Sequence, residues 1–131
     1  LVLGTLHTSS AAKTVERIVD VFPSGQQDQA RLQTSTSLVG ILSQTLCKNL
    51  SGTRSLAYEL MINTSAIANL IRDKKVSQIY SQLQTGSNEG MNTLEQCLYS
   101  HVKNGTISIE EALSKSSIPN TLIQLIESEN G

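Results

Sequence analysis

The chain has 131 residues, of which 38% are hydrophobic, and this is enough for one ordinary buried core. Ten basic and eleven acidic residues give a net charge of -1, so the chain lacks the positive charge with which proteins bind nucleic acid or anionic membranes. Aromatic residues make up only 3%, which leaves few side chains for stacking on nucleic-acid bases. We therefore expect an aliphatic core and no nucleic-acid partner.

The two cysteines, Cys47 and Cys97, are fifty residues apart, and neither belongs to a closely spaced cysteine pair. This spacing indicates neither a zinc site nor a disulfide framework. We expect two reduced thiols that are mostly buried, and no metal site.

The chain opens with the apolar run LVLGTL at residues 1–6, which we expect to form a β-strand. The run is too short for a signal peptide or a membrane span, so no direct membrane insertion is expected. Because neither a Met nor a polar lead-in precedes it, we expect the chain to be the C-terminal piece of a longer protein.

A helix should follow this strand, with Ser9 or Ser10 as its N-terminal cap. Its apolar residues recur at helical spacing, at Val15, Ile18, Val19 and Phe22. The sequence FPSG at residues 22–25 then ends the helix. A second helix is predicted over residues 26–43, polar at its start and strongly apolar toward its end.

Two extended runs, residues 45–50 and 55–62, flank the loop sequence SGTR at residues 51–54. Short extended runs around a Gly-bearing loop predict a β-hairpin. This hairpin is the one clear antiparallel element that the sequence predicts.

Short helices are expected after the hairpin. Thr64 can cap a helix that continues through Asp73, and a further helix is predicted over residues 76–84. Residues 86–90, GSNEG, should form a loop.

An amphipathic helix should then start at Met91 and end before Gly105. Asn92 and Glu95 have the spacing of a capping pair at its start. His101 is expected on its outer face, in solvent.

Ser108 and Glu111 repeat the capping-box spacing, which predicts a small helix over residues 109–115. Pro119 should start a terminal helix through residue 126. The predicted fold class is α/β and helix-dominated, with one N-terminal strand, a β-hairpin and about six or seven helices.

Three segments resemble motifs of one family and occur in that family's order. GTLHTSSA at residues 4–11 is similar to a histidine box, AIANLIRD at residues 66–73 to an AIRNLIRE motif, and QTG at 84–86 with GMNTL at 90–94 to a QTGxxxGMxTL stretch. Residues 54–61 are similar to the family's RxxAxEIM strand. Together they resemble the C-terminal part of the motor domain of the secretion ATPase superfamily, and most specifically of the PilT-like type IV pilus retraction (twitching motility) ATPases.

The resemblance implies that the chain is a C-terminal fragment of a RecA-like P-loop ATPase core. Residues 1–62 would be the C-terminal part of that core, and residues 63–131 a C-terminal helical subdomain. The resemblance also implies a homo-hexameric ring motor that binds ATP and Mg between its subunits and retracts pili. The implied partners are the pilus inner-membrane platform protein and the pilus machinery, at the cytoplasmic face of the bacterial inner membrane.

A phosphate-binding loop of the form GxxxxGK[ST] does not occur in the 131 residues. Such a loop holds phosphates with backbone N–H groups and a Lys, and holds magnesium with a hydroxyl. The acidic strand that would orient magnesium is also missing. We therefore expect no catalytic residue in this chain, no ATP hydrolysis by it alone and no tightly bound nucleotide.

His7 is the best candidate for direct contact with a nucleotide. An imidazole at the end of a strand can donate a hydrogen bond to a γ-phosphate and so sense its presence, as the resemblance implies. Thr5 and Thr8 could orient it. Without the resemblance, a satisfied structural histidine between two strand-forming threonines would be the favoured interpretation.

The segment similar to AIRNLIRE is the candidate coupling motif, which in the family links nucleotide state to retraction. Its residues are Ala66, Ile67, Ala68, Asn69, Leu70, Ile71, Arg72 and Asp73. Ala68 stands where the motif has Arg, so a guanidinium that could make paired hydrogen bonds is absent there, whereas Arg72 is kept. The alternative is an ordinary helix with an apolar core face and a solvated charge cluster at its end.

Two further interpretations stay open at this point. One is a non-enzymatic helical interaction module, and the other is a fragment of a pilus-assembly or type II secretion ATPase. Assembly ATPases usually carry a four-cysteine zinc loop in the region of residues 47–54, where this chain has one Cys, and this favours retraction. The acidic residues Glu59, Glu95, Glu110 and Glu111 show no pairing that would suit acid–base catalysis.

Overall fold

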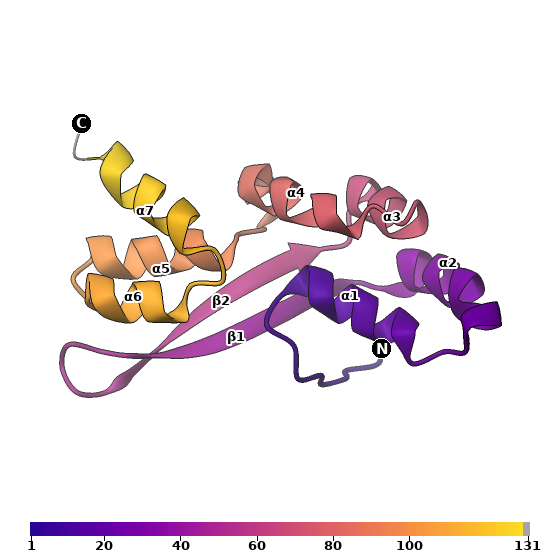
Figure 1. Cartoon of the computed structure of the whole chain (residues 1–131), viewed down its shortest axis with the longest axis horizontal. Helices are drawn as coiled ribbons and strands as arrows, with labels where there is room; N and C mark the ends of the chain where they lie inside the picture. The colour runs from indigo at the N-terminus through magenta and orange to yellow at the C-terminus, as the bar shows by residue number, and fades with distance from the viewer. Residues whose placement is uncertain (130–131) are drawn as a thin grey trace.

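A computed structural model describes residues 1–129 (Figure 1). Over this part of the chain it contains seven α-helices and one two-stranded sheet. The elements are α1 (Ala11–Asp20), α2 (Gln27–Ser37), β1 (Gly40–Lys48), β2 (Arg54–Ile62), α3 (Ser65–Arg72), α4 (Ile79–Thr85), α5 (Leu94–Lys103), α6 (Ile109–Lys115) and α7 (Pro119–Ser128). The helix-dominated fold and the hairpin are thus confirmed.

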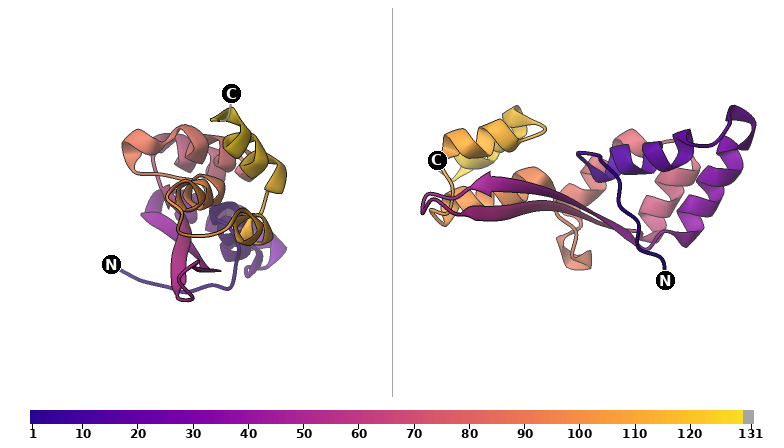
Figure 2. Two further views of the ribbon diagram at one scale, coloured as in Figure 1. Left: turned by 90° about the vertical axis from the view of Figure 1, so that its left-hand side faces the viewer. Right: turned by 90° about the horizontal axis from the view of Figure 1, so that it is seen from below.

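The hairpin is the long central element of the molecule. β1 and β2 pair antiparallel from Gly40 opposite Ile62 to Lys48 opposite Arg54. In the turn between them, Gly52 has φ +86, a left-handed conformation that glycine adopts without a steric penalty. Helices α1 to α4 gather at the open end of the hairpin, and α5, α6 and α7 lie over the end that carries the turn (Figures 1 and 2).

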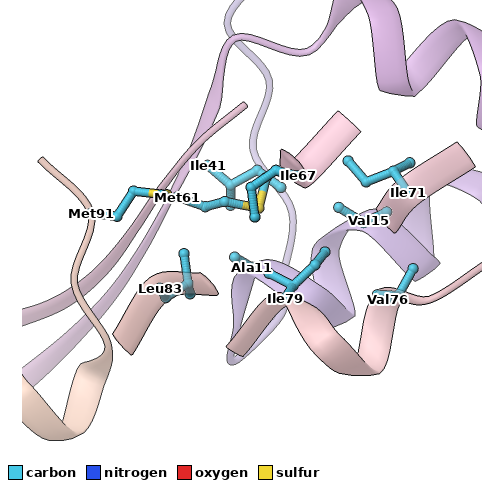
Figure 3. Close-up of a cluster of buried hydrophobic side chains, with 10 residues drawn as sticks. All are labelled: Ala11, Val15, Ile41, Met61, Ile67, Ile71, Val76, Ile79, Leu83 and Met91. Atoms are coloured by element: carbon cyan, nitrogen blue, oxygen red, sulfur yellow. The ribbon is translucent and has the colours of Figure 1, made fainter. Parts of the chain in front are cut away.

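Two clusters of buried apolar side chains cover one face of the hairpin. The first core lies at the open end, between the strands and helices α1, α3 and α4 (Figure 3); its buried members are Ala11, Val15, Ile41, Met61, Ile67, Ile71, Val76, Ile79, Leu83 and Met91. The second core lies toward the turn; its buried members are Cys47, Ala57, Leu94, Leu98, Ile107, Ala112 and Leu122. Both cores take residues from both strands.

The boundary between the ATPase core, residues 1–62, and the helical subdomain, residues 63–131, stays a prediction.

Local capping explains several helix starts. The Ser10 hydroxyl accepts a hydrogen bond from the Lys13 N–H at 3.2 Å, and the Thr64 hydroxyl accepts one from the Ile67 N–H at 3.3 Å. Ser108 does the same for the Glu111 N–H at 3.1 Å. These bonds satisfy N–H groups that have no partner within their own helix. The predicted starts of α1, α3 and α6 are therefore confirmed.

The expected strand at residues 1–6 is wrong. These residues are extended chain without strand pairing, and Leu1, Val2 and Leu3 are exposed. A strand needs a hydrogen-bonded neighbour, and within residues 1–129 the only sheet is the β1–β2 hairpin. An apolar run by itself therefore does not make a strand here.

The second helix was expected through residue 43, but α2 ends at Ser37 and β1 begins at Gly40. Asn63 holds this junction, because its Nδ2 donates to the carbonyl of Ser35 at 3.0 Å and to that of Leu38 at 2.7 Å. Its backbone N–H donates to the carbonyl of Val39 at 3.0 Å. Pairing with β2 thus decides the structure of an apolar run that fits a helix equally well.

The capping pair of α5 is shifted by one residue from the predicted pair of Asn92 and Glu95. The Thr93 hydroxyl accepts from the Gln96 N–H at 3.1 Å, and the Gln96 side chain accepts from the Thr93 N–H at 3.0 Å. Asn92 instead donates to the carbonyl of Tyr58 at 2.8 Å. The shift turns Glu95 into the protein, where it is fully buried.

The capping box predicted for α6 is only half formed. The Glu111 carboxylate accepts a hydrogen bond from the Lys48 N–H of β1 at 2.7 Å instead of folding back onto Ser108. The bounds of α6 nevertheless agree with the prediction, since the Ser108 hydroxyl supplies the cap. Within residues 1–129, no helix is both long enough and apolar enough to cross a bilayer.

Replacing Leu98 by Ala should lower the free energy of unfolding by about 2–5 kcal/mol, because the side chain is fully buried in the second core and its loss leaves a cavity. Leu32→Ala is the matched control, because Leu32 is 49% exposed and its loss should cost less than about 0.5 kcal/mol. Urea unfolding of the chain measures both. Equal costs for the two variants would contradict the assigned core.

Candidate functional site

His7 lies in the extended segment that leads into α1. Its side chain and that of Thr5 are exposed, whereas Thr8 is half-buried. Thr8 Oγ1 lies 2.6 Å from Thr14 Oγ1, and Thr14 donates to the carbonyl of Ser10 at 2.8 Å. Because the Thr14 hydroxyl has one proton and gives it to Ser10, Thr8 is the donor in the first bond. Thr8 is thus engaged by α1, and the imidazole of His7 is left accessible beside it.

A buried carboxylate meets the start of α1. Glu59, in the middle of β2, is only 4% exposed, and its Oε1 accepts a hydrogen bond from the Ala11 N–H at 2.8 Å. The backbone N–H of Leu94 also lowers the pKa of this carboxyl. Ala11 and Leu94 are the first residues of α1 and α5, where N–H groups are free and the helix dipole favours a negative charge.

The environment of Glu59 acts on its pKa in two directions. Burial raises the pKa of this carboxyl above its ordinary value, and the two backbone hydrogen bonds oppose the rise. The nearby charge of Glu95 raises the pKa of Glu59 further. We therefore expect the protonation of Glu59 to affect the stability of the fold as pH changes.

Sequence reasoning did not single out Glu59 as a functional residue. The available signal was the alternation along β2, where Ala57 and Met61 point toward the core and Glu59 shares their face. An acid on the inner face of a strand must find hydrogen-bond donors in the protein, because a buried charge without partners is costly.

A second buried carboxylate, Glu95 of α5, organises the helices near the second core. Its Oε1 accepts hydrogen bonds from the Ser116 hydroxyl at 2.8 Å and from the N–H groups of Ser117 and Ile118 at 3.0 Å each. Its Oε2 accepts from the Tyr80 hydroxyl at 3.0 Å. Burial, followed by the charge of Glu95, raises the pKa of Tyr80 to about 12. Glu95 therefore joins α4 and α5 to the segment before α7.

The candidate coupling motif occupies α3 and its C-terminal cap, and it divides into a buried face and an exposed face. Ile67 and Ile71 are fully buried in the first core, where Ala11 and Val15 of α1 also lie (Figure 3). Leu70 and Ala68 are half-buried. The histidine segment, residues 5–10, leads into α1, which thus shares the first core with the coupling motif.

The exposed face of α3 carries polar side chains. Arg72 Nη2 donates to Asn69 Oδ1 at 2.5 Å, and Arg72 Nε lies 3.6 Å from Asp73 Oδ1. Ala66 is exposed beside them. After the helix, Lys74 has φ +61 and forms an exposed ion pair with Asp28 of α2 at 2.7 Å. Both parts of the alternative interpretation, core face and charge cluster, are therefore present in this helix.

His101 and the two cysteines lie outside α1 and α3. His101 is not a free solvent residue, because its Nε2 lies 2.8 Å from the carbonyl oxygen of Leu56, so this nitrogen carries the proton. Cys47 is buried and Cys97 half-buried, both are free thiols, and burial raises the pKa of each. In the described part of the chain no three His, Cys, Asp or Glu side chains are grouped so that they could hold a metal ion.

The raised pKa of Glu59 predicts a pH-dependent contribution to stability. A carboxyl whose pKa is higher in the folded chain than the ordinary 4.5 binds more protons when folded, so the folded state loses stability as pH rises from 4.5 through the raised value. The free energy of unfolding of the wild type relative to E59Q should therefore fall over this interval, because the variant's amide does not ionise. Urea unfolding between about pH 4 and 7 measures the difference. A difference that grows with pH would contradict the prediction.

The chain is similar to proteins of pilus retraction. It is 53% identical over 119 residues to the type IV pilus retractation ATPase PilT of Pseudomonas aeruginosa, covering 91% of this chain and 35% of that protein. It is 50% identical over 113 residues to the twitching motility protein of Neisseria gonorrhoeae, covering 86% of this chain and 30% of that protein. No protein-family model matches it.

The fold gives the same result. The crystal structure of the pilus retraction motor PilT with bound ADP superimposes with a TM-score of 0.83 at 45% identity, over 92% of this chain and 34% of that one. The chain thus spans about a third of the length of the relatives that it matches. By sequence and by fold, the chain is similar to the C-terminal part of PilT-like type IV pilus retraction ATPases.

Proposed function

We propose that this chain is the C-terminal part of an ATP-driven motor that retracts type IV pili, and that it carries the motor's nucleotide sensor and its coupling helix. The observation that carries this proposal is the match to PilT across nine tenths of the chain, in sequence and in fold. The three ordered motifs support it: the first leads into α1, the second forms α3 and its cap, and the third runs from the end of α4 to the first residue of α5.

ATP and Mg would be held mainly by the part of the parent protein that carries the phosphate-binding loop. The 131 residues supply no Lys in a Gly-rich loop for this task. What they supply is His7, whose exposed imidazole can donate a hydrogen bond to a phosphate of a nucleotide bound next to it. The bond from Thr8 to Thr14 fixes the backbone beside His7, so the imidazole is held near α1. Thr5 is close enough in sequence to assist.

The coupling role falls to α3. Ile67 and Ile71 anchor the helix in the first core, and Asn69 and Arg72 stay exposed for a partner surface. Because Ala68 replaces the first Arg of the motif, Arg72 supplies the guanidinium of this helix. In the proposed motor, residues 1–62 complete the ATPase core and residues 63–131 form the helical subdomain.

The proposed assembly is a homo-hexamer in the cytoplasm, at the inner face of the bacterial inner membrane. There it would act on the inner-membrane platform protein of the pilus. Retraction is favoured over assembly because the hairpin turn is short and carries no four-cysteine loop.

Replacing His7 by Ala in the full-length protein should lower the kcat of ATP hydrolysis by about 100-fold, the effect of removing one hydrogen-bond donor from a developing phosphate charge. His101→Ala is the matched control, since that imidazole bonds the carbonyl of Leu56, outside the histidine segment, and its loss should leave kcat nearly unchanged. Steady-state hydrolysis by both purified variants decides the point. A full-length protein that neither binds nor hydrolyses ATP would instead identify a helical interaction module.

Replacing Arg72 by Ala in the same protein should abolish or strongly reduce pilus retraction while ATP hydrolysis continues, because the side chain is exposed on α3 and does not support the core. Lys75→Ala, an exposed cation three residues further on, is the control and should retain retraction. Twitching motility and ATP turnover are measured side by side. If the two variants behave alike, the role of Arg72 is excluded.

A further inference from the structure

Glu59 connects two helices that are far apart in the sequence. Its carboxylate accepts the first backbone N–H of α1, from Ala11, at 2.8 Å. The next residue, Leu60, pairs with Asn92, two residues before α5 begins, by backbone hydrogen bonds of 3.1 and 3.2 Å. The N–H of Leu94, the first residue of α5, also lowers the pKa of the Glu59 carboxyl. The side chain is 4% exposed, so water does not compete for these bonds. A carboxylate has only acceptor sites and can take two N–H groups at once. Two adjacent residues of β2, Glu59 and Leu60, thus hold the start of α1 and the segment that enters α5.

The α1 side of this connection leads to the histidine segment, residues 5–10. Ala11 directly follows this segment and lies four residues after His7. The segment is tied to α1 by the bond of Thr8 to Thr14 and by the Ser10 cap. A displacement of the histidine segment therefore moves the Ala11 N–H against a carboxylate held in the sheet.

The α5 side leads to the rest of the helical part of the chain. Leu94 lies inside the capping box of Thr93 and Gln96, and the Gln96 side chain also donates to the carbonyl of Gln84 in α4 at 3.0 Å. The neighbouring Glu95 binds Tyr80 of α4 and the N–H groups that precede α7. A shift at the start of α5 is thereby passed to α4 and α7.

We propose that Glu59 is a positioning residue that transmits the position of the histidine segment to α5, and through α5 to α4 and α7. The inference rests on the proposed function, since a nucleotide must act on the histidine segment for the connection to carry a signal. Glu59 touches no nucleotide itself. Its role is to make the starts of α1 and α5 move together.

Hydrogen–deuterium exchange of the full-length protein, with and without ADP or ATP and Mg, tests this role. In the wild type, nucleotide should change exchange in residues 5–10 and also at the start of α5. In E59Q the change at α5 should shrink by about fivefold, the effect of losing one hydrogen bond, because the neutral amide of the variant attracts backbone N–H groups less strongly than the carboxylate does. The change in residues 5–10 should persist.

Glu111→Gln is the matched control. Glu111 is another carboxylate that accepts a backbone N–H of the hairpin, from Lys48 at 2.7 Å, but it joins β1 to α6 and not to α1. Its loss should leave the nucleotide-dependent change at α5 intact. Equal loss in E59Q and E111Q would overturn the proposal, since any weakening of the hairpin would then have the same effect.

The other outcomes separate the inference from the proposed function. If nucleotide changes residues 5–10 and α5 alike in wild type and E59Q, the role of Glu59 is overturned and the motor assignment stands. If nucleotide changes nothing in residues 5–10 of the wild type, both fall. Circular dichroism confirms folding, and Glu59→Asp, which keeps the charge but is one methylene shorter, should show the same loss at α5. If neither variant folds, Glu59 serves the fold alone and the proposal is overturned.

Discussion

The fold depends on how the hairpin of β1 and β2 is covered. Two strands alone are marginally stable in water, so this hairpin persists because helices pack on one of its faces along its whole length. Ile41 and Met61 serve the first core, and Cys47 and Ala57 serve the second. Glu59 lies on β2 between Ala57 and Met61, and it is the one acidic residue on the buried face of the hairpin. Both cores thus pack on the same hairpin, which fixes their positions relative to each other.

Sequence signals that act over a few residues predicted the structure well. The caps at Ser10, Thr64 and Ser108 place α1, α3 and α6 correctly, because a side chain and an N–H three residues away decide a helix start without help from the rest of the chain. Features that depend on distant partners were missed. β1 begins at Gly40 because of its pairing with Ile62, and residues 1–6 stay unpaired because no neighbouring strand lies beside them in the described chain.

The candidate site shows the same division. Its motifs are contiguous and could be found by resemblance, but the contacts that connect them are not contiguous. The bond from Ala11 to Glu59 spans 48 residues, and that from Ile118 to Glu95 spans 23. The predicted capping pair of Asn92 and Glu95 failed for this reason, since three donors from residues 116–118 draw the Glu95 carboxylate inward. A lone sequence offers no periodicity that reports such pairings.

The polar contacts of the molecule fall into two classes with different roles. The ion pairs Arg72–Asp73, Lys74–Asp28 and Lys103–Glu129 are exposed, so water and salt screen them and they define the structure only weakly. The bonds of Glu59 and Glu95 are buried and charge-assisted, and each would leave an unpaired buried charge if its donors moved away. These two carboxylates therefore fix how the elements bonded to them are placed within the packed chain. The exposed charges at the end of α3 contribute little to that geometry, and so they are free to exchange their partners when another surface binds.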